Sequence, residues 1–272
     1  MGMLGWSINL FRIRGIQLSL HFSFLLLLAY AGYEGWQDAG SAGVFWGIAT
    51  LLAFFTCVVL HELGHSLTAR RYGVHVRRIL LMPIGGMAEF DSIPRQPSQE
   101  LVITIAGPAV NFLIAAILWC VFGFPDERSL TLLPSSITEL GQLLLIANFG
   151  MGIFNLIPVF PMDGGRILRA LLATRLSYVR ATFWASAVGK VLAGVCILFF
   201  LFLAVRADDS TDRFPYYLRA SLFVFIFGAG EAEYRAVRRR EFEEARWREA
   251  ISSLYGPQDT EEPPVLTGDS SP

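Results

Sequence analysis

Three residues with the spacing of a metal-dependent hydrolase stand close together in the sequence: His61, Glu62 and His65. Side chains four residues apart lie on the same face of a helix, so both imidazoles can bind one zinc ion. Glu62 lies beside them, where it can take a proton from the attacking water. The preceding residues 51–60 are almost all apolar, which predicts that the helix is apolar up to the metal. The alternative is a hydrogen-bonded polar cluster at a helix end that faces lipid headgroups.

A zinc ion with two histidine ligands needs a third protein ligand and an open position for water. Across the long apolar segments of the chain, the only carboxylates are Glu62 and Asp163. A carboxylate in a membrane-spanning segment costs at least about 2.5 kcal/mol on insertion scales, so two of them are best explained by a shared site. The sequence therefore predicts Asp163 as the third ligand. The alternative is that Asp163 caps the helix that begins at Gly164.

The composition predicts a membrane protein. Hydrophobic residues make up 54% of the 272 residues, and charged residues only 17%. A soluble enzyme has to cover its surface with polar groups, and this chain has too few of them. The net charge of −1 gives no reason to expect a nucleic-acid partner. The three cysteines, Cys57, Cys120 and Cys196, are isolated in apolar runs, so we expect neither disulfides nor a cysteine metal site.

Six segments approach the roughly 20 apolar residues that a membrane-spanning helix needs. They are 16–33, 42–70, 101–123, 140–160, 182–205 and 214–230. The first lacks a small-residue cleavage site and is interpreted as a retained span. We therefore expect an all-α polytopic membrane protein with about six transmembrane helices.

The fourth apolar segment is interrupted near its end. Residues 155–165 contain two prolines and a glycine pair, which weaken or break a helix. Non-helical backbone at membrane depth survives only where protein shields it or where it lines a water-filled cavity. The break therefore indicates a functional site, and a plain helix end is the alternative.

Arginine residues are distributed unequally between the connecting segments. Seventeen of them fall in 1–15, 70–100, 161–181 and the part after residue 230, whereas the remaining connections hold four. Cytoplasmic loops of membrane proteins carry an excess of positive charge. We therefore expect a multi-pass protein with both termini in the cytoplasm. The expected location is a bacterial cell membrane.

Residues 76–90 contain two short predicted strands around Pro83 and the pair Gly85 and Gly86, which is typical of a β hairpin. We expect this small hairpin to be associated with the membrane, and an irregular interfacial loop is the alternative.

The C-terminal part changes character after Gly230. Residues 231–255 combine dense charge with spaced apolar residues, which predicts a cytoplasmic amphipathic helix. Residues 256–272 are rich in proline, acidic residues and serine, and we expect them to be disordered.

Four motifs together resemble the site-2 protease family of intramembrane zinc metalloproteases. The His-Glu-Leu-Gly-His motif at 61–65 is followed by Asn-Leu-Ile-Pro-Val-Phe-Pro-Met-Asp-Gly at 155–164. Between them, Ala-Gly-Pro-Ala-Val-Asn at 106–111 is similar to the GPxxN element of that family, and Gly85 and Gly86 to its membrane-associated hairpin. The resemblance covers about residues 10–230, without the CBS or PDZ modules that some members carry.

The resemblance implies a role for each site residue. It makes Glu62 the catalytic base, assigns Asn155 to the substrate backbone or the oxyanion, and assigns Asn111 to bracing the site. It also implies one zinc ion per chain, held by His61, His65 and Asp163. Residues 1–230 would then form a transmembrane metalloprotease domain.

The implied partner is a membrane-anchored protein substrate, such as a single-span regulatory protein cleaved by regulated intramembrane proteolysis. An edge strand within 76–90, with Gly85 and Gly86, would pair with the extended substrate chain. No nucleotide partner is expected. One alternative is a transporter that uses Asp163 and Lys190 as a polar pathway. The other is an inactive scaffold that binds membrane proteins without cutting them.

Cysteine labelling of intact cells tests the predicted orientation. In a variant that lacks the native cysteines, a cysteine introduced at position 36 should react with a membrane-impermeant maleimide. Cysteines at positions 95 and 245 should react only after the cells are opened, because both lie in arginine-rich cytoplasmic segments. External labelling at position 95 would contradict the orientation.

Overall fold

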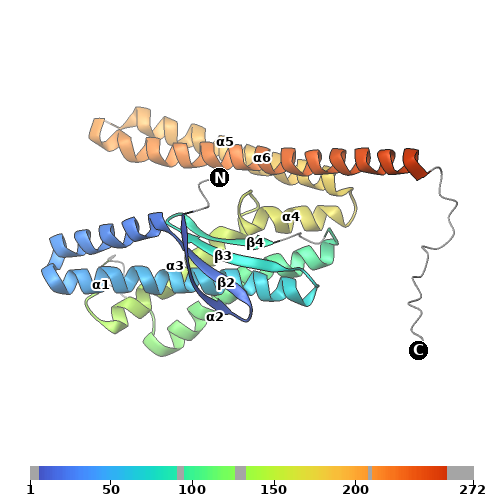
Figure 1. Cartoon of the computed structure of the whole chain (residues 1–272). Coiled ribbons are helices and arrows are strands. Elements are labelled where there is room, and N and C mark those ends of the chain that lie inside the picture. Colours follow the sequence, from blue (N-terminus) through green and yellow to red (C-terminus); the bar gives the residue numbers. More distant parts are fainter. Residues whose placement is uncertain (1–5, 91–94, 126–132, 208–209, 256–272) are drawn as a thin grey trace, which may run out of the picture.

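The computed structural model describes residues 6–90, 95–125, 133–207 and 210–255, and it is mainly helical (Figure 1). Within these ranges the helices are α1 (Phe22–Arg71), α2 (Pro97–Phe122), α3 (Ile137–Leu156), α4 (Asp163–Ala173), α5 (Tyr178–Arg206) and α6 (Ser210–Tyr255). The strands are β1 (Ser7–Ile13), β2 (Ile16–His21), β3 (Val76–Met82) and β4 (Gly85–Phe90).

Helix α1 consists of two limbs that fold back on each other. Its backbone leaves the helical region at Ala39 and at Gly40, whose φ of +59° favours glycine. The limbs approach closely at Gly35 and Gly43, where a Cβ on Gly43 would lie 1.9 Å from the Gly35 carbonyl oxygen. The first limb begins only at Phe22, so the predicted first span is wrong in its initial part, which is a strand.

The four strands form one sheet in the order β1-β2-β3-β4, in which only the β2–β3 pair is parallel. The predicted hairpin within 76–90 corresponds to β3 and β4. Strands β1 and β2 were not predicted, because the apolar run that starts at Ile16 continues without a turn signal into α1. The fold is therefore mostly helical with a small sheet, not a bundle of helices with one hairpin.

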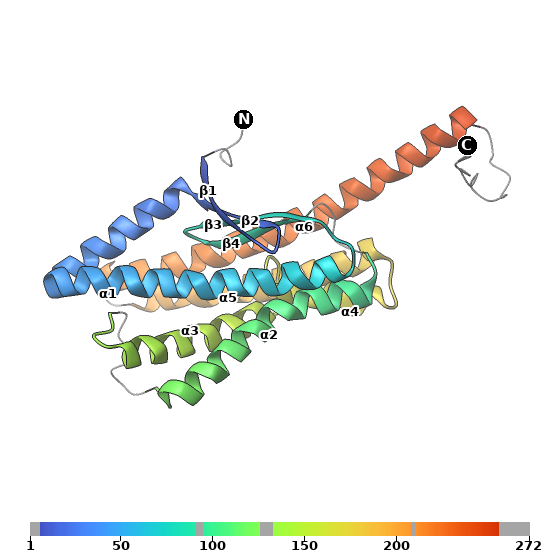
Figure 2. The same ribbon diagram turned by 60° about the horizontal axis from the view of Figure 1, so that its bottom comes forward.

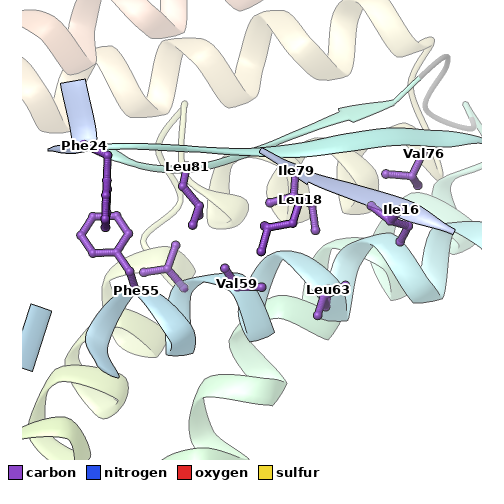
Figure 3. Close-up of a cluster of buried hydrophobic side chains, with 10 residues drawn as sticks. Ile16, Leu18, Phe24, Phe55, Val59, Leu63, Val76, Ile79 and Leu81 are labelled. Carbon is purple, nitrogen blue, oxygen red and sulfur yellow. The ribbon is translucent and has the colours of Figure 1, made fainter. Parts of the chain in front are cut away.

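The sheet packs on the second limb of α1 (Figure 3). Phe55, Val59 and Leu63 recur every four residues and so form one apolar face of this limb. They contact buried side chains of β2 and β3, including Leu18 and Ile79. This core fixes the limb from one side and leaves its other faces free for the helices α2 and α3.

In the part of the chain that the structure describes, four helices, α1, α2, α3 and α5, are long and apolar enough to cross a membrane. Large apolar side chains on the outside of α5, such as Leu198 and Val205, are exposed, as expected of a surface that faces lipid. The predicted break after the fourth apolar segment is confirmed, because α3 ends at Leu156 and helix resumes only at Asp163.

Helix α6 joins two predicted elements into one. The expected span 214–230 and the expected surface helix 231–255 are continuous, and α6 is not among the helices apolar enough to span. It runs beside α5 and extends beyond it (Figures 1 and 2). The predicted disordered tail, 256–272, lies outside the described residues.

A buried arginine connects three helices. Arg169 of α4 is 1% exposed, and its Nε and Nη2 atoms donate to Glu100 Oε1 of α2 at 2.9 and 2.5 Å. Its Nη1 donates to Glu233 Oε1 of α6 at 2.6 Å. Burial by itself lowers the pKa of the Arg169 guanidinium, but the facing carboxylates raise it above its usual value, so the side chain stays charged. The rings of Phe160 and Tyr178 lie 5.2 and 5.0 Å from the guanidinium.

Two further ion pairs fix α6 along its charged half. Lys190 of α5 lies 2.9 Å from Glu231, and Arg95, which precedes α2, lies 2.6 Å from Glu244. Together with the Arg169 network they hold α6 against α2, α4 and α5.

Replacing Arg169 should strongly destabilise the protein. Arg169→Met leaves Glu100 as an unpaired buried carboxylate, a change that costs about 3–5 kcal/mol in comparable buried pairs. Unfolding in detergent measures the loss, and adding Glu100→Gln should recover part of it. As a control, Arg175→Met removes an exposed arginine and should change the stability by less than about 0.5 kcal/mol. Equal stability of the Arg169→Met and Arg175→Met variants would contradict the importance of the network.

Candidate metal centre

The three predicted metal donors meet in the structure. The Nε2 atoms of His61 and His65 lie 3.1 Å apart, and Asp163 Oδ2 lies 3.4 and 3.2 Å from them. All three residues are buried, and their donor atoms lie within 4.8 Å of one another. Two imidazole nitrogens and one carboxylate oxygen at this spacing can hold one metal ion.

The two histidines project from the face of α1 opposite the sheet and toward α2. Each uses Nδ1 for a hydrogen bond, His65 to the Ile103 carbonyl at 2.8 Å and His61 to the Asn111 side chain. A carbonyl can only accept, so His65 Nδ1 carries the proton and Nε2 presents its lone pair to the other donors. This is the orientation that a metal-binding histidine needs.

A chain of two asparagines fixes His61 in the same way. Asn148 of α3 donates through Nδ2 to the Leu144 carbonyl at 2.8 Å, which leaves its Oδ1 to accept from Asn111 Nδ2 at 3.0 Å. Asn111 therefore presents its oxygen to His61, so that Nδ1 of His61 carries the proton. Both asparagines are fully buried.

Asn148 was missed in the sequence, although a signal was present. It is a polar residue within a predicted membrane-spanning segment, and such residues usually have a structural or functional role. The prediction that Asn111 braces the site is consistent with its contact to His61.

Helix α2 approaches the histidines through Gly107. A Cβ at this position would lie 2.1 Å from His65 Nε2 and 2.8 Å from His61 Cε1. On the facing helix, a Cβ on Gly64 would lie 2.7 Å from the Ala106 carbonyl oxygen. The two helices therefore meet through glycines, and the imidazoles fill the space that a side chain on α2 would occupy.

The start of α4 aims Asp163 at the histidines. Met162 is the N-cap residue, and Asp163 is the first residue of the helix, so the alternative in which Asp163 serves only as a cap does not describe its position. The chain turns sharply before it: a Cβ on Gly164 would lie 2.1 Å from the Ile157 carbonyl oxygen. The glycine after Asp163 is therefore required by the close approach of the broken segment.

A cavity of about 820 Å³ opens at the donor atoms. It is bounded by α1, α2, α4, α6, the hairpin β3–β4 and the break after α3. Most of its walls are apolar, and four further predicted site residues line it, namely Glu62, Gly85, Gly86 and Asn155. A Cβ on Gly86 would lie 2.8 Å from Glu62 Cγ, so β4 passes directly beside the predicted base.

The donor set fits a zinc ion. Asp163 Oδ2 is buried and has no hydrogen-bond partner among the described residues, although two imidazole nitrogens face it. A buried carboxylate oxygen without a partner is costly, and a shared cation would remove that cost. Two histidines and one carboxylate, with the cavity on the open side, are the ligand set of catalytic rather than structural zinc sites.

Comparison with known proteins identifies the family. The model of peptidase family M50 matches residues 49–127 and 129–201, which contain all three donors. The chain belongs to this family. The resemblance of this M50 peptidase to site-2 proteases is thereby confirmed.

Several relatives carry zinc metalloprotease in their names. Zinc metalloprotease MJ0392 of Methanocaldococcus jannaschii is 43% identical over 197 residues, which is 72% of this chain and 54% of the relative. Rip3 of Mycobacterium tuberculosis, also named as a zinc metalloprotease, is 31% identical over 204 residues, 70% of this chain and 50% of the relative. The chain thus spans about half the length of these relatives.

A solved structure shares the fold. The site-2 protease from Methanocaldococcus jannaschii superposes with a TM-score of 0.57 at 37% identity, over 84% of this chain and 95% of that chain.

Three other polar residues of the apolar segments and loops lie outside the metal centre. His21 caps the start of α1 by accepting from the Ser23 amide, and His75 is exposed. Lys190 pairs with Glu231 and is not among the residues that line the cavity, so the structure does not join it to Asp163 in one polar pathway.

Enlarging Gly107 should disrupt the donor set. Gly107→Ala forces both imidazoles to move, so zinc content after purification and dialysis should fall at least about tenfold, the loss that is typical when residues that orient metal ligands are changed. The matched control is Gly150→Ala, where a Cβ meets nothing within 4 Å. Zinc retention in Gly107→Ala equal to that of the control would contradict the packing described for α1 and α2.

Proposed function

We propose that the chain is an intramembrane zinc metalloprotease that hydrolyses peptide bonds of membrane-anchored proteins. The observation that carries the proposal is the convergence of His61, His65 and Asp163 at a cavity beside Glu62, in a structure with helices apolar enough to cross a membrane. Membership of peptidase family M50 supports the same reaction.

Each site residue has a distinct task in this proposal. His61, His65 and Asp163 hold the metal, which when bound would lower the pKa of water to about 7 and polarise the scissile carbonyl. Glu62, which lines the cavity, takes the proton from the attacking water and returns it to the leaving amine.

Two asparagines support the chemistry from different sides. Asn155 lies near the end of α3 and lines the cavity, and its Nδ2 donates to the Met151 carbonyl at 3.1 Å. Its remaining donor and acceptor are positioned for a substrate backbone or the developing oxyanion. Asn111 keeps His61 in the metal-binding tautomer.

The substrate enters as an extended strand along β4. This strand is at the edge of the sheet and contributes Gly85 and Gly86 to the cavity wall. Backbone pairing with an edge strand recognises an extended chain without regard to its side chains. Because Gly86 lies beside Glu62, a paired chain would pass next to the base. A membrane-anchored, single-span protein that unwinds locally fits this requirement.

The proposed arrangement in the bilayer has six spans and both termini in the cytoplasm. The two limbs of α1 supply two spans and α2, α3 and α5 supply three, all in helices apolar enough to cross a membrane. The sixth span, the first half of α6, rests on the apolar run 214–230 of the sequence. His61 and His65 lie near the end of α1 that carries Arg70 and Arg71, so water enters from the cytoplasmic side. A bacterial cell membrane is the proposed location.

Variants of Glu62 and Asp163 separate the roles of base and ligand. Glu62→Gln keeps its size but cannot accept a proton, so zinc should remain while cleavage falls by at least about a hundredfold. Asp163→Ala and Asp163→Ser should both lose zinc and activity, because two histidines do not complete the site. The measurements are zinc content and cleavage of a single-span model substrate in detergent. Full zinc and full activity in Asp163→Ser would refute the assignment of the ligand.

A further inference from the structure

Arg166 is the only lysine or arginine among the described residues that line the catalytic cavity. It lies on α4, one turn after Asp163, and its side chain is half-buried. Within the ranges that the structure describes, no hydrogen bond or ion pair to Arg166 is present, and its charge reaches Glu62 and Glu100 only at longer range. The next arginine on the helix, Arg169, is in contrast fully buried and paired twice.

Among the described residues around the cavity, no carboxylate contacts Arg166 directly. A bound divalent cation would be matched by the carboxylates of Asp163 and Glu62, and the carboxylates of Glu100 and Glu233 are occupied by Arg169. Arg166 offsets the second carboxylate of that cluster only at longer range, so among the described residues its guanidinium has no carboxylate in direct contact. It lines a cavity whose walls are mostly apolar. A cation in such surroundings is costly unless a ligand of opposite charge reaches it.

We propose that Arg166 forms a binding site for a carboxylate of the substrate, and that this site selects chains with an aspartate or glutamate close to the cleaved bond. This inference rests on the proposed peptidase function. A guanidinium presents donors in a planar fork that matches both oxygens of a carboxylate. The apolar walls strengthen that interaction relative to water, because they exclude competing solvent.

The position of the acidic residue follows from the geometry of α4 and of an extended substrate. Three residues along a helix advance about 4.5 Å, which separates Arg166 from the metal donor Asp163. A strand advances about 3.3 Å per residue. The acidic side chain therefore lies within about two or three residues of the scissile bond, on the side of the substrate that faces α4.

A set of peptides with one variable position tests the site. The probes are fluorescent, apolar nine-residue peptides with both ends blocked, each with Glu, Gln or Lys at one position. Their dissociation constants are measured in detergent with zinc-loaded Glu62→Gln protein, which cannot cleave them. At one or two adjacent positions, Glu should bind about tenfold more tightly than Gln. Adding Arg166→Met should abolish the difference, Arg166→Lys should keep part of it, and Arg166→Glu should favour Lys.

Two controls separate this site from other effects of charge. Arg175→Glu changes the net charge by the same amount as Arg166→Glu, but at an exposed position outside the cavity wall. It should leave the Glu preference intact. A second set of peptides ends either in a free carboxylate or in an amide. If Arg166→Met weakens only the free acids, the guanidinium binds the new C-terminus of the product, and the proposed side-chain selection is wrong.

The remaining outcomes also decide the question. Equal loss of binding for Glu, Gln and Lys peptides in Arg166→Met would mean that Arg166 supports the fold or Glu62, and it would overturn the inference while the peptidase function stands. Cleavage of the peptides by the wild-type chain is measured in parallel. Failure to cleave any of them, with zinc bound, would instead count against the proposed function.

Discussion

The catalytic cavity depends on holding polar groups from separate helices together inside an apolar protein. The donors lie on α1 and α4, while α2 supplies the asparagine and the glycine that fit against the histidines. The pair between Arg169 and Glu100 joins α4 to α2 at a depth where neither charge can be left alone. It is therefore the interaction that fixes where Asp163 stands relative to the imidazoles, and Glu233 brings α6 into the same arrangement.

Close packing through glycine is the second requirement, because it brings backbones near enough for short polar side chains to reach one another. Gly107 makes room for the two imidazoles, and Gly164 allows the broken segment to turn directly into α4. Helices that meet through small residues are common in membranes, where the lipid supplies no hydrophobic force to press them together. In this protein the same close packing also positions the metal donors. A methyl group on Gly107 would occupy the space of the imidazoles, and one on Gly164 would occupy the space of the turn that directs Asp163 toward them.

The sequence was most informative where a charged or polar residue occurs inside an apolar segment. His61, Glu62, His65 and Asp163 could be predicted because ionisable groups are rare in apolar segments, and the structure brings the two histidines and the aspartate together. Strand β2 could not be predicted, because its apolar residues merge with those of α1. The role of Arg169 was also hidden: arginines were counted as markers of the cytoplasmic side, and burial of one of them depends on partners far away in the sequence. The role of Asn148 could not be predicted, because the sequence does not show that it faces Asn111 of α2.

The order of the elements along the chain has a consequence for how the protein is made. Synthesis proceeds from the N-terminus, so the sheet, α1, α2 and α3 exist before Asp163 is added. All three donors are then present while α6, which supplies Leu222, Phe225 and Ile226 to the cavity wall, has yet to be synthesised. During biogenesis the donor set is therefore complete before its cavity is, and the nascent chain passes through a stage in which the ligands are more accessible than they are in the finished protein.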